Sequence, residues 1–305
     1  MLDGIIVVNK PPGPTSHDIV ALVRRLTGVR RVGHGGTLDP FAAGVLPVFV
    51  GRATRVVEYH MADEKAYRTL VVFGARSTTD DLDGELTPGE GTSPNRDVAE
   101  AALADFRGQL TQVPPTYSAV RVSGRRAYEL ARHGQRPELQ PRQVEIRELS
   151  LTDWSDADPE RPTATLEVRC SAGTYIRALA RDLGERLGCG AYLAQLTRTA
   201  SGPFRLEDAR ELDELRTVLG DGRAAQVLLP VDTGLDAYPP VRLAPEELVA
   251  LSRGQIVRPR GASGIDYHAD GERVRIVGTD GRLAAVARVQ GGRLHPEKVL
   301  LAAGG

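Results

Sequence analysis

The sequence predicts an α+β fold divided into two domains, and three observations lead to this. The chain has 305 residues, about twice a typical domain, and 41% of them are hydrophobic, which is enough for a packed core. Strand-like and helix-like segments follow one another without a regular strand–helix–strand alternation, which argues against a doubly wound parallel sheet. Past Tyr238-Pro-Pro240 the pattern changes to one helix followed by short strands. We therefore expect domains at residues 1–236 and 240–305.

Local patterns predict the elements of the first domain. A buried strand is expected from Gly4 to Val8, before the breaker run Lys10-Pro-Pro-Gly-Pro14. Ser16 is the expected N-cap of a helix that Gly28 ends. Residues 76–90 are polar and acidic and are predicted to form a surface loop. Further strands are expected at 66–73, 142–151 (with a bulge where the apolar alternation changes phase) and 163–170, and helices at 97–110 and 175–187.

The second domain is predicted to be rich in short strands. A helix is expected from Pro245 to Arg253, and strands at 274–278, 283–289 and 299–301. Asp280-Gly281 lies between two of these strands and is typical of a tight hairpin turn.

Composition excludes several classes of protein. The formal net charge of −1 gives the whole chain no attraction for nucleic acid, so any RNA-binding surface must be local. Two cysteines, Cys170 and Cys189, are too few for a disulfide framework and are expected to be reduced, buried thiols. The N-terminus shows neither a secretory signal nor a long apolar segment. We therefore expect a cytoplasmic protein that does not engage a membrane.

The segment from Gly33 to Pro47 is the strongest candidate for a functional site. It contains four glycines and two prolines in fifteen residues, and no helical or strand period. Asp39 lies in it among small and apolar residues. An isolated Asp-Pro pair more commonly marks a turn, and by itself favours that interpretation. The glycines favour a functional role instead, because they allow a large flat substrate to approach the backbone.

Other glycine-rich or metal-binding sites do not fit this segment. It does not match G-x-x-x-x-G-K-[ST], and no strand–G-x-G-x-x-G–helix unit surrounds it. His34 alone does not make a metal site, and neither cysteine lies in a C-x-x-C pair, which excludes a zinc deaminase. We expect no metal and no cofactor.

The same segment, Gly33-His34-Gly-Gly-Thr-Leu-Asp39-Pro-Phe-Ala-Ala-Gly44-Val-Leu-Pro47, resembles the signature loop of the bacterial tRNA pseudouridine-55 synthase family. Further matches follow the family's order and cover the whole first domain: Asn9-Lys10-Pro-Pro-Gly13 through Ser16, Lys65-Ala-Tyr67, Pro114-Pro-Thr-Tyr-Ser-Ala119, Gly124-Arg-Arg-Ala-Tyr128 and Ser171-Ala-Gly173-Thr-Tyr175-Ile-Arg177 with Asp182-Leu-Gly184. The resemblance implies a mixed, largely antiparallel sheet with an RNA-gripping insertion at about residues 107–142. It also implies a small pseudouridine-synthase-and-archaeosine-transglycosylase (PUA)-like RNA-binding domain at residues 240–305.

The resemblance also implies a role for each matched residue. Asp39 is the expected nucleophile, Tyr67 is expected to stack on the target base, and Arg177 is expected to hold the Asp39 carboxylate. The other residues expected to bind substrate are His34, Tyr175 and Leu196, with supporting roles for Lys65 and Lys10.

The implied reaction converts uridine 55 in the T-arm of tRNA to pseudouridine without a cofactor. Breaking the C1′–N1 bond leaves positive character at C1′, which a carboxylate can trap or stabilise. One carboxylate suffices, because the detached uracil is itself the second nucleophile. Direct attack on C1′ and a glycal-type intermediate both remain open, as do Tyr67 and water as acceptors of the C5 proton. Stacking on an aromatic ring is worth about 1–3 kcal/mol per base, which offsets part of the cost of flipping the base out.

A local basic patch supplies the RNA-binding surface that the net charge lacks. Residues 121–136 hold five arginines against one glutamate, beside two tyrosines. A solvated amphipathic helix is the alternative, but the adjoining Pro114-Pro115 and Gly124 favour a projecting insertion. We expect a monomer that binds the tRNA T-arm without a guide RNA, because guided relatives lack this insertion at the family level. A tRNA chaperone role could coexist with catalysis. The expected RNA contacts are Arg121, Arg125, Arg126 and Arg132.

Overall fold

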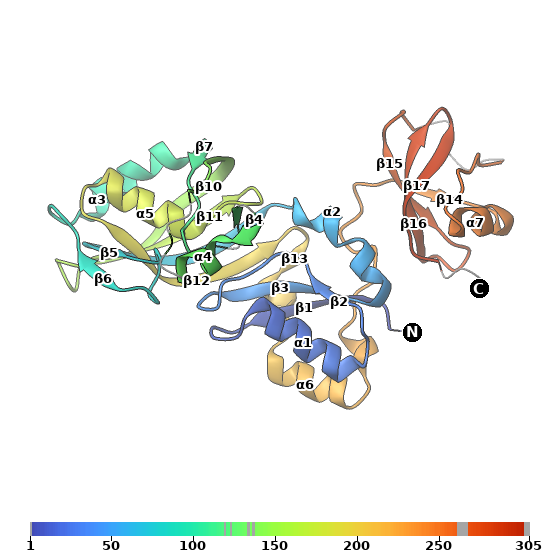
Figure 1. The fold of residues 1–305 in the computed structure, drawn as a ribbon, viewed down its shortest axis with the longest axis horizontal. Coiled ribbons are helices and arrows are strands. Elements are labelled where there is room, and N and C mark those ends of the chain that lie inside the picture. Colours follow the sequence, from blue (N-terminus) through green and yellow to red (C-terminus); the bar gives the residue numbers. More distant parts are fainter. Residues whose placement is uncertain are drawn as a thin grey trace.

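A large central sheet and a smaller sheet at one end make up the fold (Figure 1). The computed structural model describes residues 2–118, 120–122, 124–132, 135, 138–260 and 268–301. The strands of the central sheet are β1 (Gly4–Lys10), β2 (Val32–His34), β3 (Ala43–Val50), β4 (Lys65–Phe73), β7 (Gly108–Gln112), β10 (Arg142–Ser155), β11 (Thr163–Cys170), β12 (Ala191–Ser201) and β13 (Phe204–Arg205).

The remaining elements cover this sheet or extend from it. The helices are α1 (Ser16–Thr27), α2 (Val57–Met61), α3 (Arg96–Ala102), α4 (Ala127–Arg132), α5 (Ile176–Arg186), α6 (Leu212–Gly220) and α7 (Pro245–Ser252). Two small hairpins are formed by β5 (Ala75–Ser77) with β6 (Leu86–Pro88), and by β8 (Arg121–Val122) with β9 (Arg125–Arg126). The smaller sheet contains β14 (Pro240–Arg242), β15 (Arg273–Val277), β16 (Leu283–Gln290) and β17 (Arg293–Val299).

The central sheet is mixed and largely antiparallel, as predicted. Its main path runs β1-β3-β12-β4-β11-β10-β7, with β2 on β3 and β13 on β12. Among the described strands of this sheet, only β3 and β12 pair in parallel. The register of β10 against β11 shifts between Ile146 and Glu148, which places a bulge where the apolar alternation changes phase. The α+β class is confirmed.

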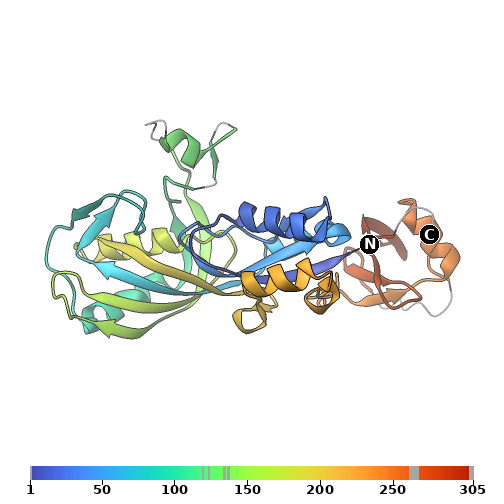
Figure 2. The ribbon, with the colours of Figure 1, turned by 90° about the horizontal axis from the view of Figure 1, so that it is seen from below.

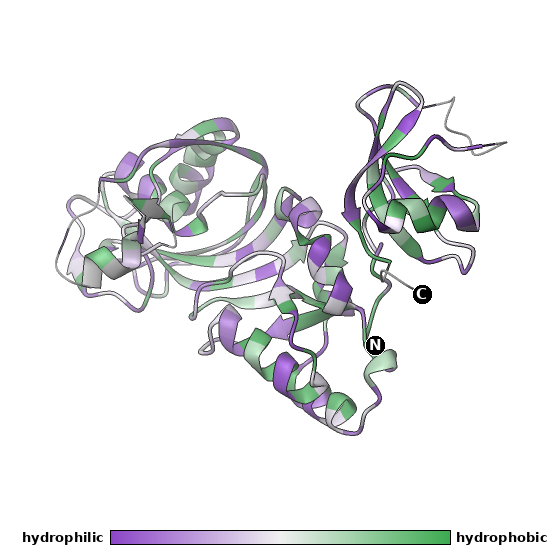
Figure 3. Cartoon of the chain, turned by 45° about the vertical axis from the view of Figure 1, so that its right-hand side comes forward, coloured by the Kyte–Doolittle hydropathy of each residue, from purple (hydrophilic) through white to green (hydrophobic). Residues whose placement is uncertain are grey.

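The largest core cluster lies on one face of the sheet because the strands alternate, and a second cluster, which includes Ile5 and Phe49, lies on the other face of β1 and β3. In β11, Leu166, Val168 and Cys170 are buried while Glu167 and Arg169 are exposed. α5 packs on the buried face through one apolar side that includes Leu179 and Leu183. Figure 3 shows hydrophilic (purple) and hydrophobic (green) residues alternating along the helices, as expected for elements with one buried side.

The β-rich C-terminal region contacts the rest of the chain through α2 and the turn before it. Lys298 pairs with Glu58 at 2.8 Å, and the Arg52 guanidinium donates to the Leu300 carbonyl at 2.9 Å. The hairpin predicted at Asp280-Gly281 joins the antiparallel strands β15 and β16. The last strand, however, runs from Arg293 to Val299 rather than from 299 to 301. His295 and Pro296 hide its alternation, and pairing with β16 stabilises it instead.

Two helix predictions need correction. Thr15, not Ser16, is the N-cap of α1, because Thr15 and Asp18 form a reciprocal capping box. The helix expected over residues 97–110 ends at Ala102, and a short 3₁₀ turn (Leu103–Phe106) follows it. Gly108 then takes a φ of +84° and opens β7, whose pairing with β10 outweighs the helical periodicity.

Candidate active site

The Asp39 carboxylate lies at a cavity of about 280 Å³ on the core-facing side of the central sheet. Six of the residues singled out from the sequence line this cavity, although they come from four separate segments. The lining includes Asp39, Lys65, Tyr67, Tyr175, Arg177 and Leu196, together with Gly36, Met61 and Arg198. The structure therefore brings most of the predicted site residues together in one place.

Asp39 occupies a turn and also faces the cavity. It is therefore both the turn residue that Asp-Pro suggests and a candidate functional residue. The Ala42 N–H donates to the Asp39 carbonyl at 3.1 Å, which closes a turn over Pro40 and Phe41. The expectation of an irregular segment up to Pro47 is wrong in its second half, because β3 already starts at Ala43. The side chain of Asp39 is about one-third exposed and therefore reachable from the cavity.

Arg198 holds the loop that carries Asp39. It is only 1% exposed and lies on β12, where its backbone pairs with Gly44. An arginine in a strand ordinarily suggests a solvated side chain, but Arg198 lies two residues after the buried Leu196 and so faces the same side of the sheet. Its guanidinium donates to three carbonyls of the loop, those of Val45 (2.8 Å), Gly36 (3.1 Å) and Thr37 (3.4 Å).

Ser16 and Lys10 hold the same loop from its other side. The Ser16 hydroxyl donates to the Leu38 carbonyl at 3.0 Å and accepts the Leu38 N–H at 2.9 Å. Lys10 is fully buried, and burial lowers its pKa to about 8, against an opposing effect of Asp39. The Lys10 Nζ does not face the cavity but donates to the carbonyls of Pro11 (2.9 Å), Pro14 (2.9 Å) and Pro40 (3.2 Å). Lys10 thus supports the loop that carries Asp39.

Replacing Lys10 with methionine should lower the free energy of unfolding by about 2–5 kcal/mol, because three partly buried carbonyls would lose the donor that the buried ammonium supplies. Lys298→Met is the matched control, since Lys298 is partly exposed and forms one surface ion pair with Glu58. That pair is worth about 0–1 kcal/mol. Urea denaturation of both variants measures the difference. Equal losses would mean that the three carbonyls find other donors when Lys10 is absent.

Arg177 joins the Asp39 loop to two other segments. It is the second residue of α5 and is 4% exposed, and its Nη2 lies 2.9 Å from the Asp39 carboxylate. Nη2 also donates to the Tyr117 carbonyl at 2.8 Å. On the other side, Nη1 lies 3.2 Å from the Asp81 carboxylate and donates to the Thr79 carbonyl at 2.9 Å. Arg177 therefore cannot turn away from Asp39 without losing several contacts.

The acidic segment at residues 76–90 is not simply a surface loop. Asp81 is buried, and burial raises its pKa against the opposing effects of Thr79 and Arg177. Asp80 pairs with Arg181, one turn after Arg177 on α5, at 3.1 Å. Sequence patterns missed this contribution because an Asp-rich stretch usually indicates a solvated loop. Asp80 and Asp81 are instead ion-pair partners of Arg181 and Arg177, which are distant in the chain.

Tyr67 and Lys65 lie two residues apart on β4 and face the cavity side of the sheet. The Tyr67 ring is partly exposed, whereas burial raises the pKa of its hydroxyl, with Arg198 opposing that shift. Lys65 is buried, and burial lowers its pKa to about 8. Its Nζ donates to the carbonyls of Asp63 at 2.9 Å and His60 at 3.3 Å, which anchors the start of the strand.

Tyr175, Leu196 and His34 differ in where they lie. Tyr175 and Leu196 line the cavity, and the Arg142 guanidinium stands 5.4 Å from the centre of the Tyr175 ring. His34 does not line it. The His34 Nδ1 accepts the Gly36 N–H at 3.3 Å, and burial lowers the His34 pKa to about 4. His34 is therefore neutral at physiological pH and contacts the Asp39 loop at Gly36.

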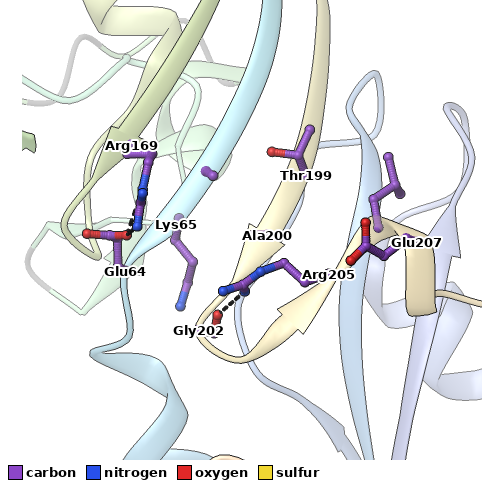
Figure 4. Close-up of a pocket in the computed structure, with 10 residues that line it drawn as sticks. Glu64, Lys65, Arg169, Thr199, Ala200, Gly202, Arg205 and Glu207 are labelled. Atoms are coloured by element: carbon purple, nitrogen blue, oxygen red, sulfur yellow. Dashed lines mark hydrogen bonds and ion pairs between the residues drawn. The ribbon is translucent and has the colours of Figure 1, made fainter. Parts of the chain in front are cut away.

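A second cavity, of about 370 Å³, lies on the other face of the sheet (Figure 4). Ala66 and its strand neighbours Arg169 and Ala200 line it, and they alternate with the residues that face Asp39. The cations in it already have partners. Arg169 pairs with Glu64 at 2.7 Å, and Arg205 donates to the Gly202 carbonyl. The cavity beside Asp39 is therefore the better candidate for chemistry.

Other predicted features can be placed only in part. The exposed Arg125 lies on β9, but the side chains of Arg121, Arg126 and Arg132 fall outside the described residues. Cys170 and Cys189 are buried free thiols. Within the described ranges, no group of three or more His, Cys, Asp or Glu side chains could hold a metal ion. No helix in the same ranges is long and apolar enough to cross a membrane.

The mixed sheet, with a cavity at which Asp39 pairs with Arg177, is consistent with the pseudouridine synthase class, and comparison with known proteins shows both the class and the family. Residues 24–176 match the model of the TruB family pseudouridylate synthase N-terminal domain, and residues 177–236 match that of the tRNA pseudouridylate synthase B C-terminal domain. The chain belongs to the TruB family and is an enzyme that forms pseudouridine in tRNA.

Similar proteins from several bacteria support this assignment. The tRNA pseudouridine synthase B of Moorella thermoacetica is 44% identical over 98% of this chain and 100% of its own length. That of Bradyrhizobium diazoefficiens is 41% identical over 97% of this chain and 85% of its own.

Among solved structures, a Cbf5-Nop10-Gar1 complex gives a TM-score of 0.69 at 27% identity, covering 98% of this chain and 85% of that one. An H/ACA RNP bound to a substrate RNA containing 2′-deoxyuridine gives 0.72 at 24% identity, covering 99% and 86%. The latter shows the fold alone.

Proposed function

We propose that this enzyme isomerises uridine 55 in the T-arm of tRNA to pseudouridine, with Asp39 as the nucleophile. The observation that carries the proposal is the pairing of Asp39 with the buried Arg177 at 2.9 Å, on a cavity that Tyr67 also lines. A carboxylate that is held by an arginine and still about one-third exposed is oriented and available to react.

In this proposal the target uridine leaves the RNA stack and enters the cavity beside Asp39. The partly exposed ring of Tyr67 stacks on the uracil, and Leu196 and Tyr175 complete the apolar walls. This contact offsets part of the cost of unstacking, since base–aromatic stacking is worth about 1–3 kcal/mol. Arg177 orients the Asp39 carboxylate toward the ribose. The guanidinium is itself held in place by its ion pair with Asp81.

The bond changes follow from these positions. The Asp39 carboxylate attacks C1′, and the C1′–N1 electron pair leaves with the uracil. The uracil rotates, C5 attacks C1′ and expels the carboxylate, and the C5 proton passes to a base. In the glycal route the carboxylate instead takes the C2′ proton as the uracil leaves, and C5 then bonds to C1′ while the carboxyl returns that proton to C2′. Because burial raises the Tyr67 pKa, its hydroxyl stays protonated, and we assign that residue to stacking rather than to proton acceptance.

We also propose a separate role for each of three segments of the chain. Residues 1–236 form the catalytic domain, the insertion at about 107–142 grips the RNA, and residues 240–305 form a PUA-like RNA-binding domain. The exposed Arg125 supports the insertion's role, since guanidinium groups suit phosphate contacts. The enzyme acts as a monomer on tRNA in the cytoplasm and needs no guide RNA. The 41–44% identity with proteins named tRNA pseudouridine synthase B supports tRNA as the substrate.

Incubating the purified enzyme with a T-arm stem-loop tests the proposal. We expect pseudouridine at position 55 and at no other uridine, without added RNA. A stem-loop with cytidine at position 55 should yield none. Pseudouridine at another position, or a requirement for a guide RNA, would contradict the proposal.

A further inference from the structure

Gln112 makes a two-sided contact with the start of α5. It is the last residue of β7 and is 3% exposed. Its side-chain Nε2 donates to the Tyr175 carbonyl at 3.0 Å, and its Oε1 accepts the Tyr175 N–H at 2.8 Å. Tyr175 is the N-cap residue of α5, and its own side chain forms no capping hydrogen bond. The Gln112 amide therefore fixes the backbone at the point where the helix begins.

The start of α5 decides the geometry of the catalytic cavity. Tyr175 and Arg177 lie within its first residues, and both line that cavity. A shift of the helix start would move the Arg177 guanidinium away from the Asp39 carboxylate, which lies 2.9 Å from it. Gln112 itself does not line the cavity. It can therefore influence the reaction only through the residues that it holds.

The residues that follow Gln112 lead into the insertion and are also fastened to α5. The Arg181 Nη2 donates to the Val113 carbonyl at 2.9 Å, and the Arg177 Nη2 donates to the Tyr117 carbonyl at 2.8 Å. Figure 2 shows α4 (green) of the insertion standing out from the body of the molecule. Gln112, Val113 and Tyr117 thus each join the base of the projecting segment to α5, and Gln112 is the first of the three along the chain.

We propose that Gln112 is a positioning residue, which sets Tyr175 and Arg177 in the cavity and links their placement to the base of the RNA-gripping insertion. This inference rests on the proposed function of the cavity residues. An apolar side chain at position 112 would leave the Tyr175 N–H and carbonyl without these partners, so the helix start would lose its fixed place.

The test compares Gln112→Met with Gln109→Met, an exposed glutamine on the same strand. Single-turnover rates at saturating T-arm RNA, the Kd for that RNA and the melting temperature are measured for each. We expect Gln112→Met to lower the rate by about 20- to 100-fold, since small misplacements of reacting groups cost factors of this size. The Kd should change by less than about threefold, and Gln109→Met should match the wild type.

A melting temperature that falls while the rate at saturating RNA stays within about twofold of wild type would overturn the proposal, because the role would then be structural only. Gln112→Glu serves if the methionine variant does not fold. Its protonated carboxyl could make both contacts with Tyr175, so its rate relative to wild type should rise as the pH falls from about 8 to 6. A flat ratio in the folded variant would count against the proposal.

Pseudouridine is scored at every uridine, and Asp39→Asn is assayed in parallel. An active Asp39→Asn variant would overturn the proposed function, whereas a fully active Gln112→Met variant would overturn only the role of Gln112.

Discussion

Asp39→Asn should abolish pseudouridine formation while leaving the fold and RNA binding in place. The amide has nearly the same shape as the carboxylate and can still accept a hydrogen bond from Arg177, but it is a poor nucleophile and carries no charge to stabilise C1′. We expect the single-turnover rate to fall by about 10⁴-fold or more, which corresponds to about 5.5 kcal/mol of lost transition-state stabilisation. The rate on a T-arm stem-loop and the Kd for that RNA are the measurements.

Asp81→Asn is the matched control, because Asp81 pairs with the other side of the same guanidinium, with Nη1 of Arg177 at 3.2 Å. It removes one carboxylate from Arg177 without removing the proposed nucleophile. The expected loss is about 10- to 100-fold, the size of a positioning effect. If the two variants lost activity equally, Asp39 would be acting as a partner of Arg177 rather than as the group that attacks.

Much of the fold could be predicted because its strands alternate and its turns carry characteristic residues. The alternation of Leu166, Val168 and Cys170 located β11, and Asp280-Gly281 located a hairpin. Errors arose where a contact distant in sequence outweighed a local preference. Pairing with β10 converted the end of a predicted helix into β7. Because Thr15 and Asp18 form reciprocal hydrogen bonds, the N-cap is Thr15 and not the predicted Ser16. The Ser16 hydroxyl instead bonds to the Leu38 backbone.

The residues of the candidate site likewise include some that the sequence could predict and some that it could not. Asp39, Tyr67 and Arg177 lie in short motifs, so a resemblance in sequence could point to them, and the structure brings them to one cavity. Arg198 and Asp81 lie outside those motifs, and each acts on a segment far from it in the chain. The residues next to Arg198 or Asp81 in the sequence do not indicate which distant segment each of them contacts. The supporting contacts of the site therefore had to come from the structure.

Gly44→Ala should be strongly destabilising, because Gly44 of β3 lies directly against the backbone of Arg198 on β12. Gly44 adopts a φ of +102°, and a Cβ there would lie 2.2 Å from the carbonyl oxygen and 2.8 Å from the nitrogen of Arg198. Both obstacles are backbone atoms of β12, which cannot turn aside as a flexible side chain would. The β3–β12 pairing would have to open, and with it the hold of Arg198 on the loop.

We expect Gly44→Ala to cost about 3–5 kcal/mol in the free energy of unfolding and to reduce the rate of the folded enzyme as well. Gly108→Ala separates the two causes. Gly108 also has a positive φ, +84°, but a Cβ there would meet nothing within 4 Å. It should therefore cost only about 1–2 kcal/mol, the conformational penalty alone. Urea denaturation gives both values. If they agree, backbone conformation explains the whole effect and close approach to Arg198 is not what requires glycine at position 44. If Gly44→Ala costs more than Gly108→Ala, as we expect, the close approach of β3 to β12 is what requires glycine at position 44, beside the Asp39 loop.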